Sequence, residues 1–526
     1  MHLASRSALT CAMLVLSAAA LPTPAASQKA PAPPADLDSY VARVMKEFQV
    51  PGLSVAIVKD GKVVVAKGYG VRELGKPAKV DAHTRFGIAS NTKIFTATAL
   101  ALLVEEGKLE WDAPVIRYLP AFAMYDPYVT REITVRDLLV HRSGLGLGAG
   151  DLMWWPNSDY SRDEIVQRLR YIKPATSFRS AYAYDNVLYS VAGEVIQAVS
   201  GQSWEDFVSS RILSKIGMTG SNAHASLATK GDNDAIPHAE VEGTVRPITP
   251  FANDNVDPAG GINSSAADMA RWLIVQLDSG RVADGSRLFS PRSTRQLWAM
   301  VTPIPIGDPA PELGALRPQF NGYALGLGVR DYRGRKILTH TGGLPGYVSQ
   351  VTMIPSLRLG VVVLTNQESG SAFQSITYHV LDHYLGVQPT DYVSIYSKLD
   401  KRQAARFDSA TAAASTARDS ASGPSLPLER YAGKYTDPWY GEIDMERGDD
   451  GLVIRFTHTP SLVGDLVHWQ HDTFVARWRD RELRADAYLT FALNPDGSIA
   501  HATMQAVSPA TDFSYDFQDL FLTRVK

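Results

Sequence analysis

Cysteine is nearly absent from the chain: its 526 residues include one, Cys11. Cys11 lies inside an apolar run over residues 8–21, which follows Arg6 and precedes small residues at 25–27. This order is typical of a secretory signal peptide, so we expect residues 1–27 to be removed and the protein to be periplasmic or secreted. The mature chain then contains no thiol, which excludes disulfides, a cysteine nucleophile and cysteine ligands for a metal.

The chain also lacks an excess of charge of either sign. Its 52 Lys and Arg residues nearly balance 55 Asp and Glu residues, for a net charge of −3, so there is no electrostatic case for binding nucleic acid. The N-terminal apolar run is short for a transmembrane helix, and no stable membrane span is expected. Hydrophobic residues at 45% indicate a globular protein, and the length predicts two or three domains.

Composition and periodicity place the domain boundaries. Residues 28–36 form a Pro/Ala-rich linker. Residues 37–398 carry β-type runs at both ends and helical patterns between them, and residues 399–426 are rich in Ala and Ser, as linkers are. Residues 427–526 hold several short strands with tight turns, which predicts a small all-β barrel or sandwich domain.

The elements of the long central domain predict an α+β fold. Its terminal strands are expected to form one antiparallel sheet, flanked by helices and by a helical subdomain. An Asp-Gly pair at 60–61 is a strong hairpin signal. The expected strands cover 53–59, 62–69, 323–330, 336–340, 347–354 and 359–366, and the expected helices 36–48, 91–106, 133–140, 163–171, 186–200, 204–216, 264–278 and 373–385.

A catalytic pattern stands at the start of the helix predicted over 91–106. This helix is apolar nearly all round, so it should be buried, yet it carries Lys93. A buried ammonium is costly unless it is paired or loses its proton. Ser90 lies three residues earlier, on the same face, in the first turn, where free N–H groups favour an anion. The pair supplies a hydroxyl, a proton acceptor and an oxyanion site, although an N-cap serine with a snorkelling lysine gives the same pattern.

Two later motifs favour the catalytic interpretation. Tyr184-Asp-Asn186 stands just before a predicted helix, and His340-Thr-Gly-Gly343 ends one predicted strand and precedes another. With Ser90-x-x-Lys93, they give the chain a pattern that resembles the serine β-lactamase and penicillin-binding-protein-like hydrolases. It is most similar to the branch of class C β-lactamases, D-aminopeptidases and esterases. Supporting similarities are Leu138 to Leu145, Ile216-Gly-Met and Pro258 to Ser265.

The resemblance implies a role for each motif. Ser90 would be the nucleophile that forms an acyl-enzyme. Either Lys93, if burial makes it neutral, or Tyr184, if it is a phenolate beside a charged Lys93, would be the base, and the sequence leaves this open. Asn186 would be a hydrogen-bond donor that orients Lys93 or a substrate carbonyl. The family pattern gives catalytic roles to Ser90, Lys93, Tyr184 and His340, and substrate or oxyanion contacts to Asn186, Thr341, Gly342 and Gly343, with the Ser90 and Gly343 N–H groups forming the oxyanion hole.

His340 is a departure from part of the family, because β-lactamases and transpeptidases usually have lysine there to bind a substrate carboxylate. Histidine is largely neutral near pH 7. The histidine form resembles the aminopeptidase and esterase branches and disfavours β-lactams. We therefore predict an exported serine peptidase for small or unusual peptides that contain D-amino acids or are linearised cycles such as linear microcystin.

Other functions remain open from the sequence. A carboxylesterase for short acyl esters, or a β-lactamase, would use the same intermediate. A non-catalytic penicillin-binding-like sensor or binding protein, or a ligand carrier centred on the C-terminal domain, is an alternative from another class. A non-catalytic sensor predicts the loss of at least one motif. Ser90, Lys93, Tyr184 and Asn186 are all present, which counts against this alternative.

The remaining features carry weaker predictions. Trp154 and Trp155 either line the cleft mouth or anchor a loop. His458, His468 and His471 are interpreted as surface histidines, and neither a metal nor a cofactor is expected.

The C-terminal domain resembles the lipocalin-like appendage of some family members, where it would cover the cleft, support a homo-oligomer or add stability.

Overall fold

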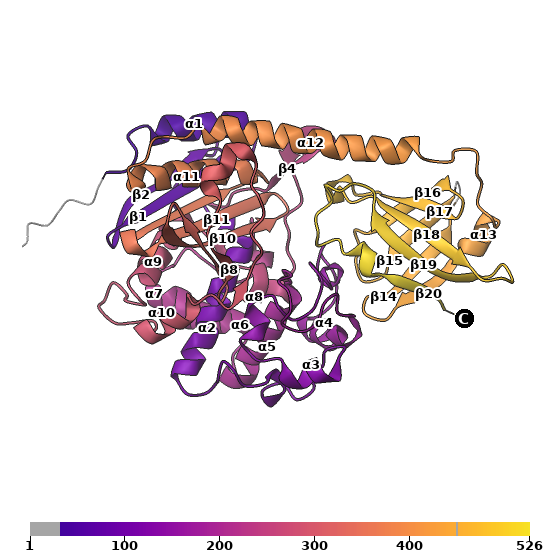
Figure 1. Ribbon diagram of the computed structural model, residues 1–526, viewed down its shortest axis with the longest axis horizontal. Helices are drawn as coiled ribbons and strands as arrows, with labels where there is room; N and C mark the ends of the chain where they lie inside the picture. Colours follow the sequence, from indigo (N-terminus) through magenta and orange to yellow (C-terminus); the bar gives the residue numbers. More distant parts are fainter. Residues whose placement is uncertain (1–31, 449–450, 526) are drawn as a thin grey trace, which may run out of the picture.

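The computed structural model describes residues 32–448 and 451–525. The predicted signal peptide and the first part of the predicted linker lie outside these residues. Figure 1 shows an α+β domain and a separate closed barrel, joined by the long helix α12 (Tyr392–Thr416). This arrangement confirms the predicted fold class. Within the described ranges, no helix is both long enough and apolar enough to cross a membrane.

The core of the α+β domain is an eight-stranded sheet in the order β2-β1-β12-β11-β10-β9-β8-β7. The N-terminal strand β1 pairs antiparallel with the C-terminal strand β12, with Ala56 opposite Val362, as the sequence predicts. The strands are β1 (Gly52–Lys59), β2 (Lys62–Gly70), β7 (Thr302–Pro303), β8 (Asn321–Tyr323), β9 (Gly328–Tyr332), β10 (Arg335–Leu344), β11 (Tyr347–Ile354) and β12 (Leu359–Thr365).

Both faces of this sheet are covered, which is why β1 and β12 are nearly continuous apolar runs. Helices α1 (Leu37–Glu47) and α11 (Gly370–Leu385) pack on one face together with the start of α12 (Figure 1). Helix α9 (Ala266–Leu277) packs on the other face, next to the helical subdomain. That subdomain contains α2 (Lys93–Glu105), α3 (Pro127–Glu132), α4 (Arg162–Arg168), α5 (Val187–Ser200), α6 (Trp204–Val208), α7 (Ser214–Ile216), α8 (Asp257–Gly260) and α10 (Pro291–Leu297).

Two local predictions are wrong. The expected helix over 133–140 is only a short 3₁₀ turn, Asp137–Leu139, because the Asp137 carboxylate accepts hydrogen bonds from Thr134 and competes with helical pairing. The expected strand over 323–330 is interrupted at Gly326, which has φ of 79° and packs against the backbone of Lys93. The His340-Thr-Gly-Gly343 motif lies at the end of β10 and precedes β11, as the sequence predicts.

The segment with linker composition is also more ordered than expected. Helix α12 continues to Thr416, well into the Ala/Ser-rich residues 399–426. Alanine has the highest helix propensity, so an exposed Ala-rich stretch can extend a helix whose first turns are anchored. The buried residues Tyr392, Val393 and Tyr396 provide that anchor.

The C-terminal domain is a closed eight-stranded barrel, in which β13 pairs with β20. Large aromatic side chains fill it, among them Tyr431, Tyr435 and Trp478, each fully buried. The strands are β13 (Gly433–Asp437), β14 (Gly441–Arg447), β15 (Leu452–Phe456), β16 (Val463–Gln470), β17 (Thr473–Trp478), β18 (Ala487–Leu493), β19 (Ile499–Ala506) and β20 (Phe521–Arg524), and a short helix, α13 (Leu428–Tyr431), precedes them.

Candidate active site

Lys93 is the centre of the site. Its side chain is fully buried, and its Nζ lies 3.0 Å from Ser90 Oγ, 2.8 Å from Asn186 Oδ1 and 3.0 Å from the Ala259 carbonyl oxygen. Three oxygens thus surround the amine: two carbonyl oxygens that accept from it, and the Ser90 hydroxyl, which can also donate to it. The structure therefore brings together residues of two separate motifs, Ser90 with Lys93 and Asn186, as the sequence predicts.

A tight turn presents Ser90. The short strand β3 (Phe86–Gly87) leads into the 3₁₀ turn Ala89–Thr92, where Ala89 has φ of 50°, in the left-handed region that alanine rarely adopts. Gly342 of β10 packs directly against this turn, since a Cβ there would lie 2.2 Å from the Ile88 carbonyl oxygen. Gly342 is thus a packing residue that brings β10 up to the nucleophile. A Cβ on Gly343 would meet nothing within 4 Å, so that position faces open space.

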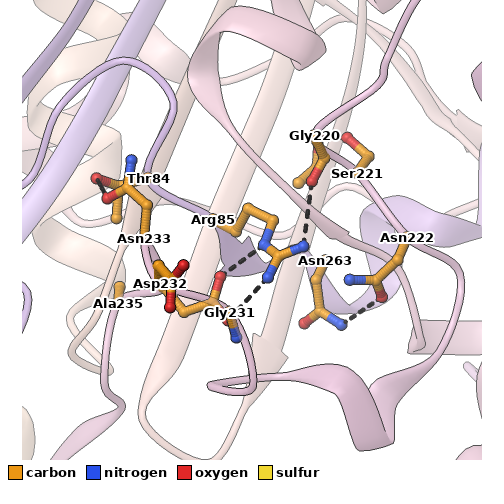
Figure 2. Close-up of polar contacts among 12 residues, drawn as sticks. Thr84, Arg85, Gly220, Ser221, Asn222, Gly231, Asp232, Asn233, Ala235 and Asn263 are labelled. Carbon is orange, nitrogen blue, oxygen red and sulfur yellow. Dashed lines mark hydrogen bonds and ion pairs between the residues drawn. The ribbon is translucent and has the colours of Figure 1, made fainter.

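Polar contacts fix the strand that precedes the turn. Arg85 forms an ion pair with Asp234 and donates a hydrogen bond to the Gly220 carbonyl (Figure 2). Asn263, next to Ser264 in the strand partner of β3, donates to Asn222. These bonds tie β3 to the segment that follows α7.

Burial sets the protonation states in the site. It lowers the pKa of Lys93 from 10.5 to about 7, although the Asp151 and Asp185 carboxylates act in the opposite direction. Burial also raises the pKa of the Tyr184 hydroxyl well above its usual 10. The Tyr184 ring centre is 4.9 Å from Lys93 Nζ. Near pH 7 the tyrosine is therefore a neutral phenol, whereas the lysine amine can readily lose its proton.

Asn186 has a different role from the predicted one. It accepts a hydrogen bond from Lys93 rather than donating one, and its Nδ2 donates to Asp151 Oδ2 at 2.8 Å. Asp151 is fully buried, and burial raises its pKa to about 7. Sequence reasoning missed Asp151, whose one local signal is its position directly after the glycine-rich loop 144–150.

His340 lies beside the site but does not line its cavity. Its Nδ1 is 2.6 Å from the Thr341 carbonyl oxygen, so Nδ1 carries the proton, and Nε2 accepts from the Tyr323 hydroxyl at 2.7 Å. Burial and the nearby Lys93 lower the pKa of His340 to about 3. The ring is therefore neutral, and its centre is 6.2 Å from that of Tyr184.

A cavity of about 270 Å³ opens over Ser90. Its lining includes Tyr184, Asn186, Thr341 and Gly343, which agrees with their predicted positions. Trp154 and Trp155 also line it, as one of the two sequence interpretations expects. A second chamber of about 670 Å³, between the two domains, shares Trp155 and Gly343 with the first.

The barrel contributes one wall of the catalytic cavity. Phe513 and Ser514, in the loop between β19 and β20, line it, and the Phe513 ring packs edge-on against Tyr184. Ser514 donates to Asp151 Oδ2 at 2.9 Å. Of the three predicted roles for the C-terminal domain, covering the cleft is the one that this geometry supports. Nothing in the sequence pattern indicates these contacts.

Asp516 fastens the barrel loop to the glycine-rich loop. This fully buried side chain accepts hydrogen bonds from the N–H groups of Gly150, at 2.6 Å, and Leu152, at 3.0 Å. Those two residues flank Asp151. The barrel thus holds the segment that presents Asp151 to Asn186.

Replacing Asp516 by alanine should lower both stability and turnover. Two buried N–H groups lose their acceptor, which costs about 1–3 kcal/mol for each unsatisfied group. We expect a lower melting temperature and a kcat reduced about tenfold, because a misplaced catalytic network loses rate steeply. Asp465→Ala, an exposed barrel carboxylate paired with Arg479, is the control. Equal behaviour of the two variants would contradict a role for the domain contact.

The barrel histidines lie away from this site. His458 forms an ion pair with Asp159, and His468 Nε2 donates to the His471 carbonyl. The side chains of His458 and His468 thus have protein partners.

Comparison with known proteins places this geometry in a family. Residues 37–385 match the family model described as beta-lactamase. The chain therefore belongs to the β-lactamase family and has the fold of these hydrolases. Residues 417–524 match a domain of unknown function (DUF3471). The resemblance stated from the three motifs is confirmed, while the likeness of the barrel to lipocalins remains a prediction.

Individual relatives cover most of the chain. A protein of Aspergillus campestris named unguisins hydrolase ungD' is 30% identical over 88% of this chain and 88% of its own length. The octameric penicillin-binding protein homologue from Pyrococcus abyssi has 23% identity and a TM-score of 0.58, covering 89% of this chain and 97% of that one. A D-stereospecific amidohydrolase from Streptomyces sp. has 21% identity and a TM-score of 0.52, covering 66% and 98%.

Proposed function

We propose that the protein is an exported serine hydrolase that cleaves amide bonds in small or unusual peptides through an acyl-enzyme on Ser90. The observation that carries this proposal is the buried Lys93 amine, 3.0 Å from Ser90 Oγ, with a pKa lowered to about 7. A neutral amine at that distance is a general base for the serine hydroxyl.

The acylation step uses the residues around Ser90. Neutral Lys93 takes the proton from Ser90 Oγ as that oxygen bonds to the substrate carbonyl carbon. The carbonyl oxygen becomes an oxyanion beside the N–H groups of Ser90 and Gly343. When the C–N bond breaks, the leaving nitrogen receives the proton from Lys93 through the Tyr184 hydroxyl. The raised pKa of Tyr184 supports this relay role rather than that of a phenolate base.

Deacylation runs the same proton path with water. A water molecule attacks the ester carbonyl and gives its proton to Lys93. The bond between Ser90 Oγ and the acyl carbon then breaks, and Oγ recovers a proton from Lys93. Asn186 and Asp151 hold the amine in place throughout, since Asn186 bridges the two.

The choice of peptide substrates over β-lactams has three supports. One similar protein is named a hydrolase of unguisins and another a D-stereospecific amidohydrolase. The buried, neutral His340 supplies no positive charge for the carboxylate of a β-lactam. The adjoining 670 Å³ chamber provides room for further residues of a peptide.

A substrate panel tests the proposal. It contains matched peptides with D- and L-residues, a linearised cyclic peptide, short p-nitrophenyl esters and nitrocefin. We expect kcat/KM for the best peptide to exceed that for nitrocefin at least about tenfold, a difference of about 1.4 kcal/mol in transition-state binding. Turnover of esters without any peptide hydrolysis would replace the peptidase by an esterase, and preferred hydrolysis of nitrocefin would replace it by a β-lactamase.

A further inference from the structure

A second group of functional side chains lies behind the active site. His224 follows α7, Asp254 begins the 3₁₀ turn Asp254–Val256, and Asp257 begins α8. His224 Nδ1 is 3.7 Å from Asp254 Oδ2 and 3.9 Å from Asp257 Oδ2. One ligand atom of each residue lies within 4.8 Å of the other two. None of the three takes part in the proposed reaction.

Asp257 has an unsatisfied oxygen that points into this group. Its side chain is fully buried, and Oδ1 accepts a hydrogen bond from the Ala225 N–H at 3.0 Å. Oδ2, the atom that faces His224, has no hydrogen-bond partner among the described residues. A buried carboxylate oxygen without a partner is unfavourable, so a cation or a proton bound at Oδ2 would stabilise it.

The surroundings favour a cation. In the described part of the chain, the ion pairs that involve Asp254 or Asp257 both have His224 as the other member, so two carboxylates face one imidazole. Asp254 is already oriented by the N–H and hydroxyl of Ser226, each at 2.7 Å. The side chains of His224 and Asp254 are 39% and 42% exposed, which leaves an approach from solvent to the buried Asp257.

The backbone at His224 is also held in place. Asn263 donates to the His224 carbonyl at 2.7 Å. Asn263 also donates to Asn222 (Figure 2), whose side chain in turn accepts from the His224 N–H. A fixed backbone presents the imidazole with little loss of conformational freedom on binding.

We propose that His224, Asp254 and Asp257 form a binding site for one divalent zinc-class ion. An imidazole nitrogen with two carboxylate oxygens is a donor set that Zn²⁺ accepts, whereas Ca²⁺ and Mg²⁺ prefer oxygen ligands. Bonds of about 2.0 Å in a tetrahedral site separate ligand atoms by about 3.3 Å. Small side-chain movements would therefore bring the three ligand atoms from their observed positions to this separation. Water completes the fourth position.

The site has a direct connection to the catalytic lysine. Asp257 begins α8, and the carbonyl of Ala259 in that helix accepts from Lys93 Nζ. The preceding carbonyl, of Pro258, accepts from Thr96 of α2 at 2.6 Å. A metal ion would anchor the start of α8 and so hold one of the three oxygens around Lys93. Asp257 and His224 are then positioning residues.

Zinc titration of the full-length, untagged protein tests the site. After treatment with a chelator, calorimetry should show one Zn²⁺ per wild-type chain, and excess Zn²⁺ should raise the melting temperature by about 2 °C or more. Mg²⁺ should do neither. His224→Gln should lose both effects, and Asp257→Asn should lose binding while remaining folded, because its amide fits the same space.

His458→Gln is the matched control, since His458 also pairs with a carboxylate, on the barrel. It should bind Zn²⁺ like the wild type. The proposal is overturned if the wild type binds no Zn²⁺, or if His224→Gln binds it as well as the wild type does. Neither readout uses turnover, so failure of the metal site leaves the proposed hydrolase reaction unaffected.

Discussion

Ser90→Ala should reduce kcat/KM for the best peptide substrate by about 10⁴-fold or more, the size of loss seen when a catalytic serine is removed. The substitution deletes the only atom that can form the acyl-enzyme, while Lys93, Asn186 and the cavity remain. Stability should change little, because the hydroxyl faces the cavity and its hydrogen-bond contacts are with Lys93 and Tyr184 inside the site. Steady-state kinetics and a thermal melt measure the two effects.

Ser409→Ala is the control for this variant. Ser409 lies on the exposed part of α12, away from both domains' cores. It should keep full activity. Retention of more than a few per cent of wild-type kcat/KM by Ser90→Ala would mean that the reaction does not pass through this serine.

Lys93→Met should lower kcat by about 10²–10⁴-fold, the contribution of a positioned general base. Methionine has similar length but no proton acceptor. It also removes an amine that burial disfavours in its charged form, but it leaves Asn186 Oδ1 and the Ala259 carbonyl without their donor. Because these two effects oppose each other, the melting temperature should change little. Lys108→Met, which changes an exposed lysine paired with Glu106, should alter neither quantity. A fall in stability of Lys93→Met with little loss of rate would make Lys93 a structural residue.

Lys93 as the general base also determines the direction in which activity depends on pH. The active form of Lys93 is the deprotonated amine, whose pKa burial lowers to about 7. Activity, measured as kcat/KM, should therefore rise as the pH increases through about 7 and then level off. It should not require the much higher pH at which the buried Tyr184 would ionise. A profile that is flat between pH 5 and 9 would contradict Lys93 as the base.

Local spacing explains which parts of the site could be predicted. Ser90 and Lys93 are three residues apart where the 3₁₀ turn Ala89–Thr92 leads into α2, so their contact follows from helical geometry alone. The sheet could be predicted because strands such as β1 and β12 are apolar enough to be recognised individually. The lone lysine in an otherwise apolar helix was already a signal that burial would alter its charge.

Contacts between segments far apart in the sequence could not be predicted from local spacing. The direction of the Asn186 hydrogen bonds depends on Asp151, which reaches it from another loop. The barrel wall around Phe513 depends on how two domains dock, and docking leaves no periodic pattern in the sequence. His340 was expected to act on substrate, but Tyr323 and the Thr341 carbonyl occupy both of its nitrogens. The extended helix α12 was missed because Ala/Ser-rich composition is compatible with both a linker and a helix.

The central claim is that Ser90 is an activated nucleophile, and intact-mass measurement after reaction with a fluorophosphonate tests it most directly. The wild type should gain one covalent adduct per chain, located on Ser90 by peptide mapping, and Ser90→Ala should gain none. Lys93→Met should react far more slowly than Lys108→Met. A wild-type chain that stays unmodified, or an adduct that persists in Ser90→Ala, would contradict the account.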